Sequence, residues 1–342
     1  LYWEGAAVCR HLMQSNAVTG VYLLLEASLG SGSALYRLKR FDECIAEFRE
    51  AVHQSQVMFR IDRGKHARLL ARSLSLLSGA LGVTNRIVEA VETRRASVDL
   101  WAELSKADSE YYLPELAENL ESLSSLLVMV QDYRGALEAS IRTVDIYRDL
   151  IKENHDLFIH RLARSLLQNS SMLDKEFRHL ESLQMTQEAV DIYRILIQKM
   201  PDRFAYDLSR SLDQLSSCLI QHEENDLALI AIEEAINLLQ IEFNKSPAEY
   251  AIDLCLRLCR RAALRLDLGN SDGALADAES VILLLSESMK VDWQGDTTEV
   301  LALAREIRDL VQFRSKQKWR GSLEEKIETI RKLLLRSDTM PQ

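Results

Sequence analysis

The sequence contains few of the residues that build tight turns. Only 12 of its 342 residues are Gly and 4 are Pro, and aromatic residues make up 6%. Because Gly and Pro punctuate turns, their scarcity leaves little material for a chain of short strands. Leu, Ala, Glu, Arg and Ser instead recur at helical spacing, and few segments alternate as strands do. We therefore predict an all-α chain.

A basic excess and a long apolar run are also missing. The formal net charge is −10, which argues against nucleic acid as the partner because binding phosphates requires a basic face. The longest apolar run near the N-terminus, Val21–Leu25, falls far short of the roughly 20 residues that span a bilayer. We expect neither a nucleic-acid nor a membrane partner. The first residue is Leu1 rather than Met, so we expect a piece of a larger protein.

Cysteine pairs and catalytic motifs are scarce as well. The five cysteines have no paired spacing, which suits a reducing compartment, and we expect a cytoplasmic location. Cys255 and Cys259 would share a helical face, but further metal ligands are missing around them, so we expect buried packing. The stretch GSGS at Gly30–Ser33 lacks the ending of a phosphate-binding loop, and the seven histidines form no HExxH motif. We predict no catalytic residue, no metal and no cofactor.

What the sequence does contain is a period of 46 residues. The string VDIYR occurs at Val144–Arg148 and again at Val190–Arg194. Stepping by the same interval gives a row that is uniformly leucine: Leu24, Leu70, Leu116, Leu162, Leu208 and Leu254. Two further rows are uniformly small: Gly32, Ser78, Ser124, Ser170, Ser216 and Ala262, and Cys44, Ala90, Ala136, Ser182, Ala228 and Ala274. Such rows indicate an internal repeat.

Each unit contains two helical patterns. In the third unit, Leu116, Leu120, Leu123 and Leu127 form one apolar stripe, and a second stripe starts at Ala136. Small residues let the two helices approach closely, and stacked units bury the faces that one unit alone cannot. Pro201 and Pro247 should mark bends between units. We predict an α-solenoid of antiparallel helix pairs, with units at residues 21–66, 67–112, 113–158, 159–204, 205–250 and 251–296.

The small-residue rows resemble those of the tetratricopeptide repeat (TPR). The sixth unit, LDLGNSDGALADAESVILL, carries the likeness best, through Gly269, Ala274 and Ala262. The period exceeds the usual 34 residues of that repeat, and HEAT-like repeats are the alternative. Units with IYR late in one helix and LARSL early in the next are similar to long-unit arrays in large fungal and bacterial multidomain proteins. Kinesin light chain repeats are a more distant likeness.

The resemblance implies that the first helices of the units line a groove. One register of those helices holds Arg72, Arg164 and Arg210. Gln168 and Gln214 lie one turn further on, beside Asn169 and Asp213. Stacked arginines could pair with acidic side chains or a carboxylate terminus of a partner. We expect these seven residues to form a peptide-binding or protein-binding surface.

Three functions remain open at this point. The first is a non-enzymatic scaffold that binds a protein or peptide in its groove. The second is the regulatory or sensor region of a larger signalling protein, with other domains of the same chain as partners. The third, of another class, is a helical-repeat enzyme with a site assembled across units.

The two ends of the chain differ from the repeats. Residues 1–20 should form the end of a preceding helix or an N-terminal cap, and residues 297–342 should form capping helices. From Arg305 to Arg336 there are ten basic residues against five acidic ones. Ser322 and Glu325 resemble a capping box that opens a last helix. This basic segment is expected either to cap the array or to bind an acidic partner.

Overall fold

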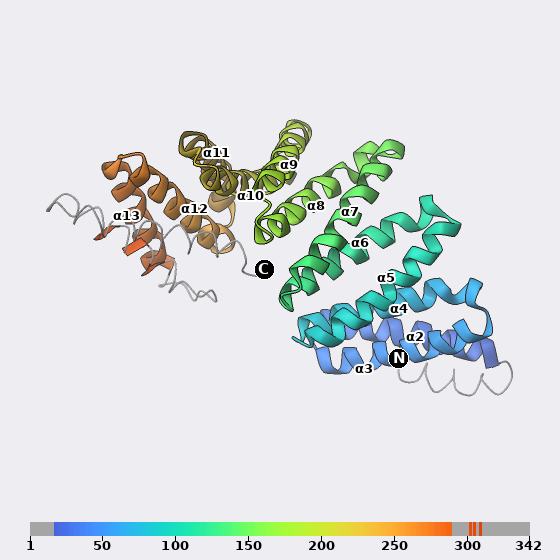
Figure 1. The fold of residues 1–342 in the computed structure, drawn as a ribbon. Coiled ribbons are helices and arrows are strands. Elements are labelled where there is room, and N and C mark those ends of the chain that lie inside the picture. Colours follow the sequence, from blue (N-terminus) through green and yellow to red (C-terminus); the bar gives the residue numbers. More distant parts are fainter. Residues whose placement is uncertain (1–16, 289–300, 303, 306–307, 310–342) are drawn as a thin grey trace. The chain divides into compact units, whose positions relative to one another are not determined.

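A computed structural model describes residues 17–288, 301–302, 304–305 and 308–309, and in these residues every regular element is an α-helix (Figure 1). The chain divides into two compact units, Leu1–Glu176 and Phe177–Gln342. The first unit contains α2 (Ala17–Arg37), α3 (Phe41–Ile61), α4 (Arg63–Val83), α5 (Ile87–Ala107), α6 (Ser109–Met129), α7 (Tyr133–Glu153) and α8 (His155–Lys175). The second contains α9 (His179–Lys199), α10 (Pro201–Gln221), α11 (Asn225–Lys245), α12 (Pro247–Asp267) and α13 (Ser271–Ser288).

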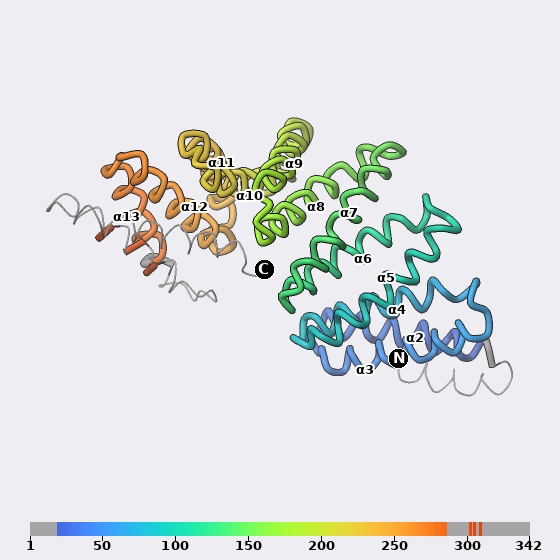
Figure 2. Tube along the Cα trace, in the orientation of Figure 1, coloured from blue at the N-terminus to red at the C-terminus, as the bar shows by residue number. Residues whose placement is uncertain are grey.

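Within each of the two compact units, every helix packs against the next one along the chain, as Figures 1 and 2 show. The even-numbered helices, here called A helices, start 46 residues apart, and so do the odd-numbered B helices. Each A helix begins four residues before the unit start expected from the sequence. The predicted fold class, an α-solenoid of antiparallel helix pairs, is confirmed.

Two kinds of connection separate the helices. A single residue joins each B helix to the next A helix. At three of these connections the side chain of the single residue caps the A helix. Asp62, Asp108 and Asn154 accept hydrogen bonds of 3.1, 3.1 and 3.4 Å from backbone N–H groups. After the next two connections, Pro201 and Pro247 occupy the first turn of the A helix, where a missing N–H costs nothing. The predicted bends therefore coincide with helix starts.

The three-residue turn from an A helix to its B helix contains a left-handed residue. Its φ is positive at Lys39, Asn85, Gln131, Phe177, Glu223 and Gly269, which recur with the helix period. The next residue closes the helix end in the Schellman pattern: Arg40 N–H donates to the carbonyl of Leu35, and Arg86 N–H to that of Leu81, both at 3.0 Å. Five of six turns thus use a residue other than glycine.

The small-residue rows lie in the contact between A and B helices. The hydroxyl groups of Ser78, Ser124 and Ser216 donate to backbone carbonyls twelve residues later, at 2.8, 2.9 and 2.9 Å. These serines therefore hold the two helices together as well as letting them approach. At Gly32 an added Cβ would lie 2.5 Å from the Phe48 ring, so the GSGS stretch serves packing.

The repeated string VDIYR contributes packing residues. Tyr147 is fully buried and Tyr193 is 2% exposed. Each ring lies beside a phenylalanine from the start of the next A helix, Tyr147 with Phe158 and Tyr193 with Phe204, at centroid separations of 6.4 and 6.3 Å. These aromatic pairs bind one repeat to the next.

The predicted terminal segments fall largely outside the described residues. Residues 1–16 of the expected N-terminal cap lie outside them, and residues 17–20 belong to α2. Of the expected capping region at 297–342, only six residues are described, among them buried Ala304. Among the described helices, none combines the length and the apolar character needed to cross a membrane.

Candidate functional site

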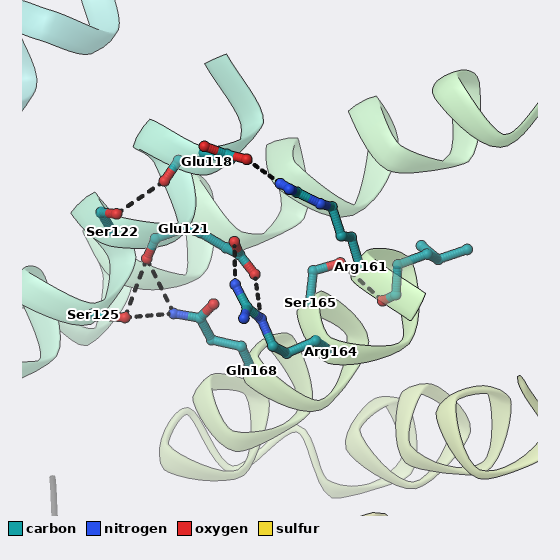
Figure 3. Close-up of polar contacts among 9 residues, drawn as sticks. Glu118, Glu121, Ser122, Ser125, Arg161, Arg164, Ser165 and Gln168 are labelled. Atoms are coloured by element: carbon teal, nitrogen blue, oxygen red, sulfur yellow. Dashed lines mark hydrogen bonds and ion pairs between the residues drawn. The ribbon is translucent and has the colours of Figure 1, made fainter. Parts of the chain in front are cut away.

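In the first unit, α6 and α8 meet through a row of polar side chains (Figure 3). The Arg164 guanidinium forms a bidentate ion pair with the Glu121 carboxylate. Its Nε and Nη2 atoms donate hydrogen bonds of 3.2 and 2.9 Å to the two carboxylate oxygens. One turn later the Gln168 amide donates to the Glu121 carbonyl at 3.2 Å and to the Ser125 hydroxyl at 3.0 Å. Two of the predicted binding residues therefore brace neighbouring A helices.

The Glu121–Arg164 pair is unequal in burial. The Glu121 side chain is 9% exposed, whereas the Arg164 side chain is 59% exposed. A second pair, Arg161 with Glu118, lies one turn nearer the start of α8. Burial is the largest single influence and lowers the pKa of Arg161, but the interactions with Glu118 and Tyr147 together outweigh it and raise the pKa. Both arginine side chains are partly exposed to solvent, Arg161 at 33% and Arg164 at 59%.

In the second unit, α10 and α12 meet in the same manner. The Asp213 carboxylate binds Arg260, whose guanidinium also donates to the Asp213 carbonyl at 3.0 Å. The Tyr206 hydroxyl donates to the Asp253 carboxylate at 2.6 Å. Arg257 on α12 is 3% exposed, and its Nε has no hydrogen-bond partner among the described residues. The contact between α10 and α12 is therefore rich in arginine and largely buried.

In three of the A helices, the side chain at the same position of the repeat contacts the following A helix. This position is occupied by Ser75 on α4, Glu121 on α6 and Asp213 on α10. Ser75 donates to the Asn119 side-chain oxygen at 2.7 Å, Glu121 accepts from Arg164, and Asp213 accepts from Arg260. The position is therefore a repeated joint whose chemistry changes along the chain.

The joint between α4 and α6 includes a buried arginine from α5. Arg94 is 7% exposed and donates to the Ser78 hydroxyl at 3.2 Å, the Asn119 amide oxygen at 2.6 Å and the Ser75 carbonyl at 2.9 Å. All three acceptors are neutral. Burial lowers the pKa of Arg94 to about 10, so the guanidinium remains charged at neutral pH. The network holds three helices together.

The remaining predicted residues differ in their surroundings. Arg72 is exposed on α4 and Arg210 is half-buried on α10, and neither side chain forms a hydrogen bond or ion pair within the described part of the chain. Gln214 is half-buried one turn after Arg210. Asn169 is 4% exposed, and its side-chain oxygen has no hydrogen-bond partner among the described residues. Asn169 therefore does not share the accessible surface of the arginines.

Sequence reasoning missed the partners of these residues. Glu121 and Arg260, the partners of Arg164 and Asp213, were not singled out as binding residues. Neither were the pairs Glu118–Arg161 and Asp253–Tyr206. The separations are 43 residues for the α6–α8 pairs and 47 for the α10–α12 pairs. Since the period is 46, a search for opposite charges displaced slightly from it could have found the ion pairs.

The cysteines of the described region are packing residues. Cys44, Cys218, Cys255 and Cys259 are free thiols with no exposed surface. Burial raises the pKa of Cys44 to about 11 and that of Cys255 to about 12. In the residues that the structure describes, no group of three or more His, Cys, Asp or Glu side chains could hold a metal ion.

No protein-family model matches the chain, and no curated protein matches it.

Solved structures do resemble it. A Signal Transduction ATPase with Numerous Domains (STAND) protein with a tetratricopeptide repeat sensor, from Pyrococcus horikoshii, has a TM-score of 0.62 at 13% identity, over 96% of this chain and 46% of that one. BtubC (BKLC) from P. vanneervenii gives 0.57 at 16% identity, over 73% and 92%. The apo form of RapI gives 0.55 at 17% identity, over 85% and 97%. At these identities the likeness shows the fold.

The fold is that of the tetratricopeptide-repeat solenoids. The small-residue rows identified in the sequence lie where the helices of a pair approach most closely, as that repeat requires. The chain therefore folds as an array of helical repeats whose units are longer than the usual 34 residues.

Proposed function

We propose that the chain is a non-enzymatic scaffold that binds an acidic segment of a protein or peptide along its A helices. The observation that carries this proposal is the state of Arg72 and Arg210. Arg161, Arg164 and Arg260 all have carboxylate partners on neighbouring A helices, whereas these two have none among the described residues. In a chain of net charge −10, arginines without a carboxylate partner favour an acidic ligand.

The chemistry of such a surface is recognition. Arginine presents a rigid fork of donors that matches a carboxylate in two bonds, as Arg164 does with Glu121. The carboxylates nearby, Glu118, Glu121 and Asp213, are engaged in ion pairs, so they reinforce the surface instead of serving as an acid or a base. Gln168 and Gln214 add amide groups one turn further along their helices. Each unit is proposed to contribute its own binding surface.

The test uses the full chain and peptides selected from an acidic display library. Binding is measured by fluorescence anisotropy for the wild type, Arg72→Glu and Arg210→Glu. We expect each substitution to weaken binding of the peptides held by its own unit at least tenfold, because attraction becomes repulsion. Arg134→Glu, a charge reversal at an exposed B-helix position, is the matched control and should leave binding unchanged. Equal affinity of all four proteins would refute the assignment.

A second candidate function is a sensor region within a larger signalling protein. The observation that favours it is the match to the STAND protein with a tetratricopeptide repeat sensor, since 96% of this chain aligns with less than half of that protein. In that case the ligand-binding surface would control another domain of the same chain. Sequencing of the full-length transcript tests this candidate. A reading frame without a nucleotide-binding domain would contradict it.

A further inference from the structure

The contact between the A helices α4 and α6 carries an excess of positive charge. Arg94 of α5 is buried against both helices and donates to neutral acceptors, so its charge has no carboxylate partner. Arg68 and Arg72 lie one turn apart on the exposed side of α4. In the α6–α8 contact, by contrast, Arg161 and Arg164 each have a glutamate. The residues of the α4–α6 contact therefore leave positive charge uncompensated.

The neighbouring acids do not cancel this charge. Glu118 of α6 is paired with Arg161 of α8. Glu115 of α6 forms no side-chain hydrogen bond or ion pair among the described residues, and neither does Glu26 of α2. Burial and Glu118 raise the pKa of Glu115 by more than Arg68 and Arg161 lower it, so Glu115 is a weak partner for Arg68. The two exposed arginines of α4 are left for a ligand.

A series of aromatic rings holds Arg68 in place. The Tyr111 ring lies against Tyr112 at a centroid separation of 4.8 Å, and Tyr112 lies against the buried Trp101 at 5.9 Å. The central guanidinium carbon of Arg68 lies 5.1 Å from the centre of the Tyr111 ring. This cation–π contact leaves the N–H donors at the edge of the guanidinium available to a ligand. Because the side chain is already held, binding costs less conformational entropy.

Two arginines one turn apart match a phosphate better than a single carboxylate. One guanidinium is enough for one carboxylate in this protein, since Arg164 alone binds both oxygens of Glu121. A phosphate monoester carries a charge of about −1.5 to −2 at neutral pH and has three acceptor oxygens, so it can accept from two arginines at once. The Cβ atoms of Arg68 and Arg72 are about 5–6 Å apart, as is usual four residues apart in a helix, which is within reach of one such group.

We propose that Arg68 and Arg72 together bind the phosphate of a phosphorylated serine in the partner segment. This inference rests on the proposed function, because Arg72 belongs to both. The two guanidinium groups supply the hydrogen bonds, and Tyr111 positions Arg68. The charge of Arg94 adds to the attraction, because it lies in the interior, where charges are weakly screened. Glu118 and Glu121 already occupy the arginines of the α6–α8 contact, so no phosphate is expected there.

The test starts from a peptide library with a fixed central phosphoserine, which is captured on the full chain and analysed by mass spectrometry. An enriched peptide is then made with phosphoserine, aspartate or serine at its centre, and its affinity is measured by fluorescence anisotropy. We expect the phosphoserine form to bind about tenfold more tightly than the aspartate form, because it engages the second arginine. In Arg68→Ala and in Arg72→Ala this preference should fall about threefold or more.

Tyr111 is tested separately, because it acts through Arg68. Tyr111→Phe keeps the face of the ring and should bind the phosphoserine peptide as the wild type does, whereas Tyr111→Leu should weaken binding about threefold. In the Arg68→Ala background, Tyr111→Leu should have no further effect. A general loss of structure would not produce this pattern.

Arg134→Ala, at an exposed B-helix position, is the matched control and should keep the wild-type preference. Equal affinity of the wild type for the phosphoserine and aspartate forms would overturn the inference. So would an unchanged preference in both arginine variants, or a library that yields no binder. If acidic peptides without phosphate still depend on Arg72, the proposed function stands while this inference fails. A chain that captures no peptide from this library or from the acidic one would refute both.

Discussion

Replacing Arg164 with alanine should destabilise the first unit, because it leaves a buried carboxylate without its partner. Glu121 is 9% exposed and receives two bonds from Arg164. Once the guanidinium is removed, the Glu121 charge remains in a place where only part of its hydration can be restored. The partner residue is in the opposite situation, since Arg164 is 59% exposed and stays hydrated without Glu121.

The expected magnitude follows from this asymmetry. Breaking a fully buried ion pair by removing one partner costs about 3–5 kcal/mol, and an exposed pair is worth about 0–1 kcal/mol. Because water enters from the Arg164 side, we expect Arg164→Ala to cost about 1–2 kcal/mol. Glu121→Gln keeps the shape and leaves the exposed partner solvated, so it should cost less than about 1 kcal/mol. Arg72→Ala, at an exposed arginine without a partner, should stay within about 0.5 kcal/mol of the wild type.

Hydrogen exchange of the α6 and α8 amides is the suitable assay, because repeat arrays open locally and a single global unfolding transition is not assured. The free energy of local opening should fall most for Arg164→Ala, less for Glu121→Gln and least for Arg72→Ala. If Arg164→Ala and Arg72→Ala had the same opening free energy, the bracing role of Arg164 would be refuted. A larger effect of Glu121→Gln than of Arg164→Ala would show that the burial argument has the wrong sign.

Two further predictions concern the backbone and the cysteines. Gly269→Ala should lower the free energy of unfolding of the second unit by about 1–2 kcal/mol, because Gly269 has a φ of 83°, a conformation that is costly for an L-residue. An added Cβ would meet no atom within 4 Å, so the backbone conformation alone determines this cost. Glu223→Gly at the equivalent turn should raise it. Opening free energies from hydrogen exchange that were the same in both variants and the wild type would contradict the steric argument. The thiols of Cys44, Cys218, Cys255 and Cys259 should not react with Ellman's reagent at pH 8 in the native protein, because all four are buried and burial raises the pKa of Cys44 and Cys255. Rapid native labelling of any of them, located by mass spectrometry, would contradict this.

The helices could be predicted from the sequence because their packing rows preserve residue type. Leucine at Leu116, a small residue at Ala136 and a proline at Pro201 each have one structural use, so a fixed period reveals it. The turn conformation could not be found in this way. The left-handed position holds Lys, Asn, Gln, Phe, Glu and Gly, which share a backbone geometry and no side-chain chemistry. Of the six, Gly269 alone carries the usual sequence signal.

The candidate site was predicted less completely because its residues act in pairs across repeats. A list of arginines in one register could not distinguish Arg164, which is paired, from Arg72, which is not. The distinction depends on which residue the preceding A helix places opposite the arginine, as α6 places Glu121 opposite Arg164. Asn169 shows the same limit, since Gln168 beside it is half-buried whereas Asn169 itself is 4% exposed.

The polar contacts between A helices follow from a general property of a repeat. A position that packs between helices must keep its residue class, whereas a position at a joint needs only a partner that changes with it. Ser75, Glu121 and Asp213 occupy the same place and are joined by Asn119, Arg164 and Arg260. An arginine at such a joint is therefore structural wherever its carboxylate is present and available to a ligand where it is absent.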